Sequence, residues 1–375
     1  MIPKINAKYS LMNTIKGIVY ALIGKQKYGL HEENNTYCVN HARTGLRMAL
    51  SALQLPANSK VGVGMYNCYT VMNAIKIAGY QPVFIDVTTD FVLDLKDLES
   101  KKNQLSALIV THLFGIPNDM TQIAAICTGM PIIEDCAHAF LSKDSQQQAL
   151  GTKGDFAIYS IGQGKFPSIG DGGLLQVNNQ SYLPYIEQEY TNLFSYSKIK
   201  DALSCVAAFS KSILHKPFIY RFILPIKKRS QDKKLSTTTY GHVEKKMATS
   251  VYKRYREEQP YYLTYLQKQQ DNTREILQHV QHIADCYIPF MDTNNYNCFM
   301  LPIVANNRDA IIQKFAKQGV EIAPHFAKCI EWGMLFGYEQ GNCEQAENLA
   351  KKMLVIPVHY NLSKQQLHTI SKALQ

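Results

Sequence analysis

The sequence predicts an α/β protein, with a large domain on a mostly parallel sheet followed by a small C-terminal α+β domain. Three observations support this fold class. Short apolar runs alternate with helical patterns from about Tyr37 to about Val177, as in a parallel sheet with crossover helices. The middle third is polar and helix-rich, and a strand, helix, strand, helix order follows from about Asn297.

The predicted strands of the large domain are short runs rich in Val and Ile, which is typical of strands buried on both faces of a sheet. They cover residues 61–65, 82–87, 107–115, 131–137, 154–161 and 172–177. The helical patterns that lie among these runs cover residues 44–53, 70–78 and 119–127. This alternation predicts strands joined by crossover helices.

The C-terminal part begins with a long amphipathic pattern at 252–280, which we expect to be a helix that links two domains. Residues 319–326 are then predicted to be the second strand of the small domain, and a closing helix follows the sequence IPVHYNLS. We therefore predict a large domain at 1–250 and, at 251–375, the linking helix with the small C-terminal domain. The large domain would include an N-terminal arm at 1–36 and a basic, apolar segment at 205–235.

The composition fits a globular protein with a large core, because 46% of the 375 residues are hydrophobic and 19% are charged. The nine cysteines are scattered without CxxC spacing, which argues against a disulfide framework and a zinc site, so we predict no metal. The N-terminus lacks the pattern of a secretory signal, and no run of about 18 apolar residues follows. We therefore expect a cytoplasmic protein.

The net charge of +10 is compatible with nucleic acid, an anionic membrane or phosphorylated small molecules as partners, and we predict no nucleic acid partner. Residues 211–234 mix Lys and Arg with Phe, Ile, Leu and Tyr. One interpretation is weak peripheral contact with anionic lipid. The other is an ordinary loop and helix with a solvated face, which is favoured because Pro217 and Pro225 interrupt any long amphipathic helix.

A glycine-rich loop at 159–173 lies between two predicted strands and contains one lysine, Lys165. Glycines let the backbone approach a ligand closely, and Ser160 could give its hydroxyl group to an anion there. Taken alone, a lysine in such a loop is weak evidence for a site, because most lysines face solvent.

Asp135 ends a predicted buried strand, and a carboxylate at that end of a parallel sheet is expected to contact a ligand. The alternative is a helix N-cap, since Asp is a favoured cap and a helix-like pattern follows. His138, three residues on, is either a stacking or hydrogen-bonding group of the same site or a structural histidine.

Residues 40–53 begin a helix directly after a predicted strand, so its first free amide groups would point at an anion. Arg43 would add a forked, charged contact to a phosphate. A surface arginine is the alternative, although the positive end of the helix dipole disfavours it without an anion.

A lysine, a carboxylate, an anion cradle and a group packed on the ring are what pyridoxal phosphate (PLP) needs from a protein. Lys165 would form the Schiff base with the cofactor. An ionised Asp135 would keep the pyridine nitrogen protonated, so that the ring can accept electrons. The presence of these groups in one chain predicts a PLP enzyme.

Six ordered segments from about residue 38 to the C-terminus resemble the DegT/StrS-type sugar aminotransferases. They are HARTGLRMALSAL, GYQPVFIDV, VTHLFGIPNDM, IIEDCAHAF, YSIGQGK with GDGG, and IPVHYNLS. The resemblance implies PLP fold type I, with a seven-stranded type of sheet, and a homodimer with sites at the interface. It also implies Lys165 as the cofactor-binding lysine, Asp135 as the pyridine partner, Ser160 as a phosphate ligand and His138 beside the ring.

Two segments depart from the usual family pattern at the cofactor. Where the family shows Ser-Gly-Thr, this chain has His41-Ala42-Arg43, as in a variant subgroup with arginine there, which implies Ala42 and Arg43 as phosphate contacts. The ring-stacking position, often aromatic in the family, falls near Cys68, with Tyr66 and Tyr69 adjacent. Ala42, Arg43 and Cys68 are our expected cofactor contacts, and the sequence leaves open which residue of this stretch covers the ring.

A third departure lies at 237–251, where Tyr240 and His242 stand in place of the family's Asn-x-Arg-Met stretch that reaches the neighbouring subunit. Some relatives also replace the cofactor lysine with histidine and deoxygenate the sugar. Lys165 keeps transamination chemically available in this chain.

The expected reaction moves an amino group from an amino acid, with L-glutamate as the expected donor, to a nucleotide-linked keto-sugar. Its product would serve polysaccharide, glycan or secondary-metabolite biosynthesis. The departures at 41–43 and 237–251 leave a second interpretation open. In that case, a protein of the PLP fold binds PLP or a sugar nucleotide as a regulatory or assembly partner, without turnover.

Overall fold

The computed structural model describes residues 1–5, 9–24, 35–230, 244–280 and 286–374. Its centre is a seven-stranded sheet in the order β1-β7-β6-β5-β4-β2-β3. The strands are β1 (Thr36–Val39), β2 (Lys60–Gly64), β3 (Gln81–Ile85), β4 (Ala107–Thr111), β5 (Ile132–Asp135), β6 (Phe156–Ser160) and β7 (Gly173–Val177). Strands β2 to β6 pair in parallel, whereas β7 is antiparallel to both of its neighbours. The predicted α/β fold class is therefore confirmed.

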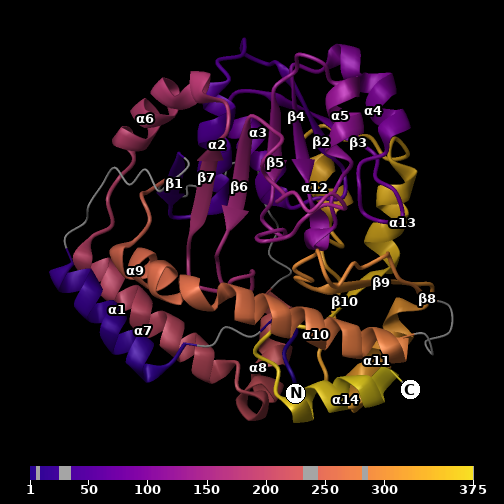
Figure 1. The fold of residues 1–375 in the computed structure, drawn as a ribbon. Coiled ribbons are helices and arrows are strands. Elements are labelled where there is room, and N and C mark those ends of the chain that lie inside the picture. Colours follow the sequence, from indigo (N-terminus) through magenta and orange to yellow (C-terminus); the bar gives the residue numbers. More distant parts are fainter. Residues whose placement is uncertain (6–8, 25–34, 231–243, 281–285, 375) are drawn as a thin grey trace.

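The sheet is buried on both faces because its central strands carry apolar side chains at nearly every position. Ile109 and Ile133 belong to the main core cluster, in which helices α2 (Ala42–Ala52) and α3 (Tyr69–Ile77) also take part. Leu108 and Val110, on the opposite face, pack in a second cluster with α4 (Leu95–Lys101) and α5 (Met120–Ile126). This two-sided covering is what the apolar runs predict. Figure 1 shows the sheet with these helices around it.

Seven further helices follow the large sheet in the described part of the chain and complete the main body of the protein. They are α6 (Leu183–Asn192), α9 (Thr249–Glu258), α10 (Tyr262–Val280), α11 (Arg308–Lys317), α12 (Cys329–Met334), α13 (Glu344–Lys352) and α14 (Lys364–Leu374). The predicted linking helix is in fact two helices, because a 3₁₀ turn with Pro260 near its start separates α9 from α10. Proline lacks the amide hydrogen that a continuous helix needs.

The small sheet has the order β10-β9-β8 and is antiparallel. Its strands are β8 (Cys286–Tyr287), β9 (Leu301–Ala305) and β10 (Met353–Ile356). The predicted strand at 319–326 is wrong, since that segment makes only single bridges, from Val320 to Ile2 and from Ala323 to Val355. One core cluster joins side chains of both sheets, so the division at residue 250 stays a prediction.

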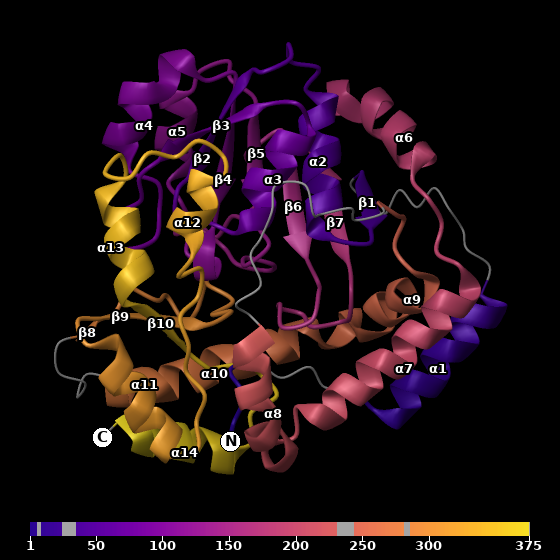
Figure 2. The ribbon, with the colours of Figure 1, turned by 180° about the vertical axis from the view of Figure 1, so that it is seen from behind.

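Three helices form an accessory layer at the edge of the molecule: α1 (Leu11–Ile23), α7 (Lys198–Leu214) and α8 (Pro217–Ser230). Helices α1 and α7 lie side by side in both views (Figures 1 and 2) and run in opposite directions. The amide of Tyr9 donates to Ser212 Oγ at 3.0 Å, and Lys198 Nζ donates to the carbonyl of Leu22 at 3.1 Å.

The predicted interruption of this region by two prolines is half right. Pro217 starts α8 after a break from α7, but α8 continues through Pro225 to Ser230. The predicted segment 205–235 also extends to residues 231–235, which lie outside the described part of the chain. Among the described residues, the helices are too short or too polar to cross a membrane.

Candidate active site

A cavity of about 300 Å³ opens beside the carboxyl ends of the parallel strands β4, β5 and β6. Ligand sites in such sheets occur at this edge. All the residues that the sequence predicts as cofactor contacts line this one cavity: Ala42, Arg43, Cys68, Asp135, His138, Ser160 and Lys165. Residues separated by more than 100 positions thus meet in one place.

Lys165 lies in the loop between β6 and β7. Its amide donates to the carbonyl of Gly162 at 3.0 Å, and a bridge from Gly162 to Gly170 closes the loop. The Nζ atom lies 5.1 Å from the ring centroid of Phe299. Burial lowers the pKa of the Lys165 ammonium, although Cys68 and Asp135 oppose the shift. A larger share of Lys165 is therefore the neutral amine, which is the form that attacks a carbonyl or accepts a proton.

Asp135 is the last residue of β5, and its carboxylate accepts hydrogen bonds from the amide of Ala137 at 3.0 Å and from Thr111 Oγ1 at 3.4 Å. Burial raises the pKa of Asp135, while the Ala137 hydrogen bond and the nearby Lys165 ammonium act in the opposite direction. The chain continues in turns rather than a helix, so the N-cap interpretation is wrong. A buried carboxylate of this kind is best stabilised by a cationic partner.

His138 lies in an aromatic wall beside the cavity. Its ring is 4.5 Å from that of Phe299 and stacks at 5.8 Å on that of Phe326. The amide of Phe114 donates to His138 Nδ1 at 3.4 Å, which leaves the proton on Nε2. Burial, followed by the charges of Lys165 and His325, holds the pKa of His138 well below its ordinary value. The neutral ring can therefore pack against a flat ligand without bringing a charge.

Two residues of this wall have strained backbones. Phe114 has φ of 58° and Phe326 has φ of 55°, in the left-handed region that bulky residues rarely adopt. Both rings contact His325, and Phe326 lines the cavity. Strain of this kind persists where the surrounding packing over-determines the conformation, and it often occurs at ligand sites.

The amino-terminal end of α2 forms another part of the cavity. Ala42 and Arg43 are its first two residues, and His41 precedes them in an extended conformation. A Cβ atom on Gly173 would lie 2.2 Å from the amide nitrogen of Ala42, so only glycine allows β7 to approach the start of this helix. Ser160 ends the neighbouring strand β6 and lines the same cavity. Amide groups, a guanidinium and a hydroxyl together make an anion cradle.

Cys68 is the residue at the ring-stacking position that reaches the cavity. It caps α3, and its Sγ atom lies 3.1 Å from Thr70 Oγ1. The adjacent tyrosines are directed elsewhere. Tyr66 donates to the carbonyl of His325, and the ring of Tyr69 packs 5.4 Å from that of Phe336.

Sequence reasoning missed several residues of the cavity. Asn67 donates to Thr111 Oγ1 at 2.8 Å, which in turn contacts Asp135. Thr111 ends the observed strand β4, whereas the predicted strand continues to residue 115, so the sequence did not indicate that its side chain lies at the edge of the sheet. Nothing in the local pattern indicates Phe326, which arrives from the C-terminal part of the chain. Tyr240 and His242 lie outside the described residues.

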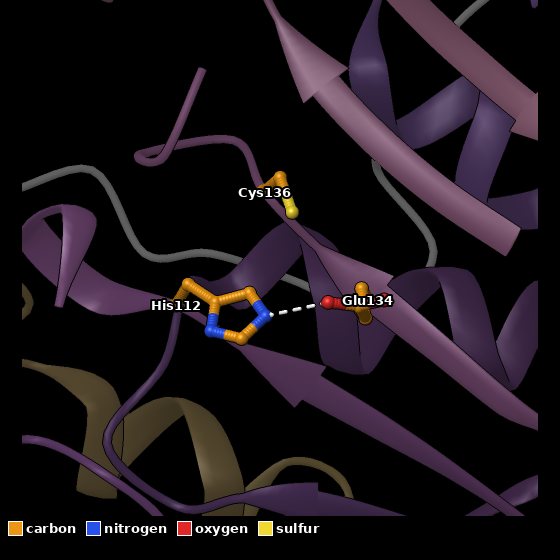
Figure 3. Close-up of side chains that lie close together, drawn as sticks. All are labelled: His112, Glu134 and Cys136. Atoms are coloured by element: carbon orange, nitrogen blue, oxygen red, sulfur yellow. Dashed lines mark hydrogen bonds and ion pairs between the residues drawn. The ribbon is translucent and has the colours of Figure 1, made fainter. Parts of the chain in front are cut away.

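Directly behind Asp135 lies a buried group of His112, Glu134 and Cys136, whose donor atoms are close enough to suggest a metal site (Figure 3). His112 Nδ1 accepts a hydrogen bond from the amide of Asn118 at 3.1 Å, so Nε2 carries the proton that it donates to Glu134 at 3.0 Å. Burial also raises the pKa of the Cys136 thiol well above its ordinary value. Both ring nitrogens of His112 are therefore used in hydrogen bonds within the protein.

The Glu134 carboxylate accepts three further hydrogen bonds, from the amides of Gly151 at 3.0 Å, Lys153 at 2.7 Å and Gly154 at 2.6 Å. Burial alone would raise the pKa of Glu134, but the bond with His112 and these amides lower it below its ordinary value. These hydrogen bonds act as a brace: they connect the end of β4, strand β5 and the loop before β6, and so fix the position of the strand that carries Asp135.

Glu134→Gln is expected to lower the free energy of unfolding at pH 7 by about 2–3 kcal/mol, because the buried network loses its negative charge and one of its two acceptor oxygens. Since the pKa of Glu134 is depressed in the folded state, its contribution is present above the unfolded value and disappears as the pH falls through the folded value. The difference between wild type and variant should therefore shrink in acid.

Urea unfolding at pH 7 and below pH 4.5 measures this difference. Glu99→Gln is the matched control, since Glu99 lies on the surface, where it forms an exposed ion pair with Lys102. An equal loss of stability in both variants would contradict the role of Glu134 as a brace.

A family model described as the DegT/DnrJ/EryC1/StrS aminotransferase family matches residues 27–193 and 246–375. GDP-perosamine synthase of Escherichia coli O157:H7 is 33% identical over 147 residues, which are 38% of this chain and 40% of that protein. UDP-N-acetyl-3-dehydro-alpha-D-glucosamine 3-aminotransferase of Acidithiobacillus ferrooxidans is 32% identical over 139 residues, 35% of this chain and 36% of that protein. Each alignment thus spans less than half of the relative.

Solved structures show the same fold over nearly the whole chain. Sugar aminotransferase CalS13 of Micromonospora echinospora has a TM-score of 0.74 at 16% identity, covering 100% of this chain and 99% of its own. Spr1654 of Streptococcus pneumoniae in its PMP form has a TM-score of 0.75 at 16% identity, covering 99% and 97%. With most of its length matched by the family model, the chain belongs to the DegT/DnrJ/EryC1/StrS aminotransferase family.

Proposed function

We propose that the protein is a PLP-dependent sugar aminotransferase, which moves an amino group from an amino acid to a nucleotide-linked keto-sugar. The observation that carries the proposal is one cavity lined by a lysine of lowered pKa, a buried carboxylate and the start of a helix. The family and the PMP and PLP forms of the structural neighbour Spr1654 support the cofactor.

The donor set of the cavity fits PLP. The amides at the start of α2, with Arg43 and Ser160, would hold the phosphate group. Asp135 would face the pyridine nitrogen, and the positive charge there would offset the cost of burying this carboxylate. Cys68 and the neutral ring of His138 would pack beside the ring. Bound PLP supplies an electron sink for the carbon from which the substrate loses its proton.

The residues of the chain would perform the remaining steps. The Lys165 amine would hold the cofactor covalently between turnovers and, once displaced by substrate, would accept the proton from the substrate carbon and return it. Its lowered pKa suits this exchange, because burial makes the neutral amine easier to form than in a lysine exposed to water. The aromatic wall of His138, Phe299 and Phe326 would keep water from that face of the cavity.

We propose L-glutamate as the donor and a GDP- or UDP-linked keto-sugar as the acceptor. The two curated relatives described above carry GDP- and UDP-sugar names, and the net charge of +10 favours a diphosphate-bearing substrate. We also propose a homodimer, which the family resemblance implies, a cytoplasmic location, and a product for polysaccharide, glycan or secondary-metabolite biosynthesis. We prefer turnover to binding alone, because Lys165 and Asp135 face the same cavity.

An absorbance spectrum of the purified protein with PLP, before and after L-glutamate, tests the proposal. The expected result is a visible band that glutamate converts into a near-ultraviolet band, followed by return of the visible band when a keto-sugar nucleotide is added. A stable visible band with every amino acid tested would favour the regulatory alternative, and the absence of any band would remove the cofactor.

A further inference from the structure

The accessory layer lies outside the part of the chain that the family model matches. The family model matches residues 27–193 and 246–375, whereas α1, α7 and α8 fall before or between these ranges. These helices are nevertheless packed together, as the opposite ends of α1 and α7 are hydrogen-bonded. The solved structures cover 99–100% of this chain, so the shared fold extends over the layer, whereas the sequence of the layer lies outside the ranges that the family model matches.

Helix α1 is amphipathic with its large side chains turned outward. Its buried residues are small: Thr14, Gly17 and Ala21. A Cβ atom on Gly17 would lie 2.7 Å from Cys205 Sγ, so the helix sits close against α7. The exposed face carries Leu11, Met12, Ile15, Val19, Leu22 and Ile23. A helix stabilised only by the protein's own core would bury such residues.

Helices α7 and α8 also expose large apolar side chains. Their exposed large apolar residues are Ile199, Leu203, Val206, Leu214, Phe218 and Phe222. The three helices thus hold twelve of the twenty-one exposed large hydrophobic side chains in the described part of the chain. Such a concentration on the surface of a protein marks an interaction site rather than scattered exposure.

The charge exposed on this layer has a single sign. The described lysines and arginine of α7, α8 and the link between them are exposed: Lys198, Lys200, Lys211, Lys216 and Arg221. Asp201 is the acidic residue in the sequences of the three helices, and it is buried, where it accepts a hydrogen bond from the amide of Ser250 at 3.1 Å.

We propose that the accessory layer binds the surface of an anionic lipid bilayer. Its apolar side chains would enter the boundary between headgroups and acyl chains, and its lysines and arginines would lie near lipid phosphates. A second copy of the chain is a poorer occupant, because it would bring like charges against each other. Since no described helix can cross a membrane, the contact would be peripheral.

The layer also touches the loop that carries Lys165. Lys211 Nζ on α7 donates to Gln163 Oε1 at 3.4 Å, and Gln163 lines the active-site cavity. Lipid binding would therefore place the cavity next to the membrane surface. The inference rests on the exposed helices and not on the proposed function, so that either can fail without the other.

Co-sedimentation of the full chain, loaded with PLP, with vesicles tests the inference. Vesicles of phosphatidylcholine with phosphatidylglycerol are compared with phosphatidylcholine alone, at low and high salt. Phe218→Glu and Phe290→Glu form a matched pair, because each phenylalanine is 74% exposed and only Phe218 belongs to the layer. Ile15→Glu tests α1 independently.

We expect the wild type and Phe290→Glu to sediment with the anionic vesicles, and high salt to weaken this binding. Phe218→Glu and Ile15→Glu should each bind about tenfold more weakly, since a charge replaces an inserted apolar group. No sedimentation at low salt, or equal losses for Phe218→Glu and Phe290→Glu, would overturn the proposal. So would a change of oligomeric state in Ile15→Glu, seen by analytical ultracentrifugation, with vesicle binding unchanged.

Discussion

Lys165→Ala is expected to remove the visible absorbance band of the PLP-loaded protein and to lower kcat for transamination by about 10⁴-fold or more. The side chain is held over Phe299 at 5.1 Å and has a lowered pKa. Among the described residues that line the cavity, Lys165 is the only lysine, so it is the amine placed both to bind the cofactor covalently and to move the proton. The fold should survive, because the residue lies in a loop at the edge of a cavity.

Borohydride reduction gives a direct measurement of this role. Reduction of the wild type with PLP should fix the cofactor mass on the peptide that contains Lys165, and the Lys165→Ala protein should carry none there. Lys96→Ala, on the exposed surface of α4, is the control and should retain both band and rate. Survival of the band in Lys165→Ala would assign the cofactor to another lysine.

Asp135→Asn is expected to lower kcat by about 10³-fold while PLP still binds, because a neutral amide cannot hold a proton on the pyridine nitrogen. The side chain is of equal size and keeps an oxygen for the amide of Ala137, which donates at 3.0 Å in the wild type. The loss should therefore appear in turnover and in the position of the absorbance band, with little change in the free energy of unfolding.

Steady-state kinetics with the amino acid donor, together with urea unfolding, separate these effects. Asp119→Asn is the control, since Asp119 caps α5 at the surface and asparagine caps equally well. If Asp135→Asn were as active as the wild type but less stable, Asp135 would be a structural group of the turn that follows β5.

The sequence predicts the site well where the fold itself brings residues together. Asp135 and Ser160 end neighbouring parallel strands, so knowing that both are strand ends already places them at one edge of the sheet. The same reasoning predicts the place of Ala42 and Arg43. A helix that starts directly after a strand begins beside the carboxyl end of that strand, at the same edge of the sheet. Lys165 needed the family resemblance, because a lone lysine in a glycine-rich loop has many ordinary explanations.

Residues that arrive from distant segments could not be predicted in this way. Phe299 and Phe326 reach His138 through the packing of the C-terminal part on the large sheet, which has no local signal. The strand expected at 319–326 fails for a related reason. The segment that pairs with β9 is β10 (Met353–Ile356) and not residues 319–326. Which of two apolar segments joins the sheet depends on tertiary packing, so apolar character alone does not predict it.

Part of the accessory layer was within reach of the sequence, since residues 211–234 already indicate an apolar and basic segment, but the outward-facing helix α1 was not. Periodicity identifies an apolar stripe and assigns it to the core, but α1 turns its small residues inward and its large ones to solvent. The N-terminal arm at 1–36 was expected only as an extension of the large domain. Its packing against α7, far along the chain, depends on a close contact between Gly17 and Cys205.

The pairing of β1 has a consequence for how the chain folds during synthesis. Thr36 lies opposite Gln176, so the first strand pairs within the sheet with a strand made much later. Until the ribosome has produced β7, β1 has no partner in the sheet, while β2, β3 and β4 can already assemble. Such non-local pairing slows folding and prolongs exposure of an apolar edge. We therefore expect nascent chains that end before residue 173 to depend on chaperones.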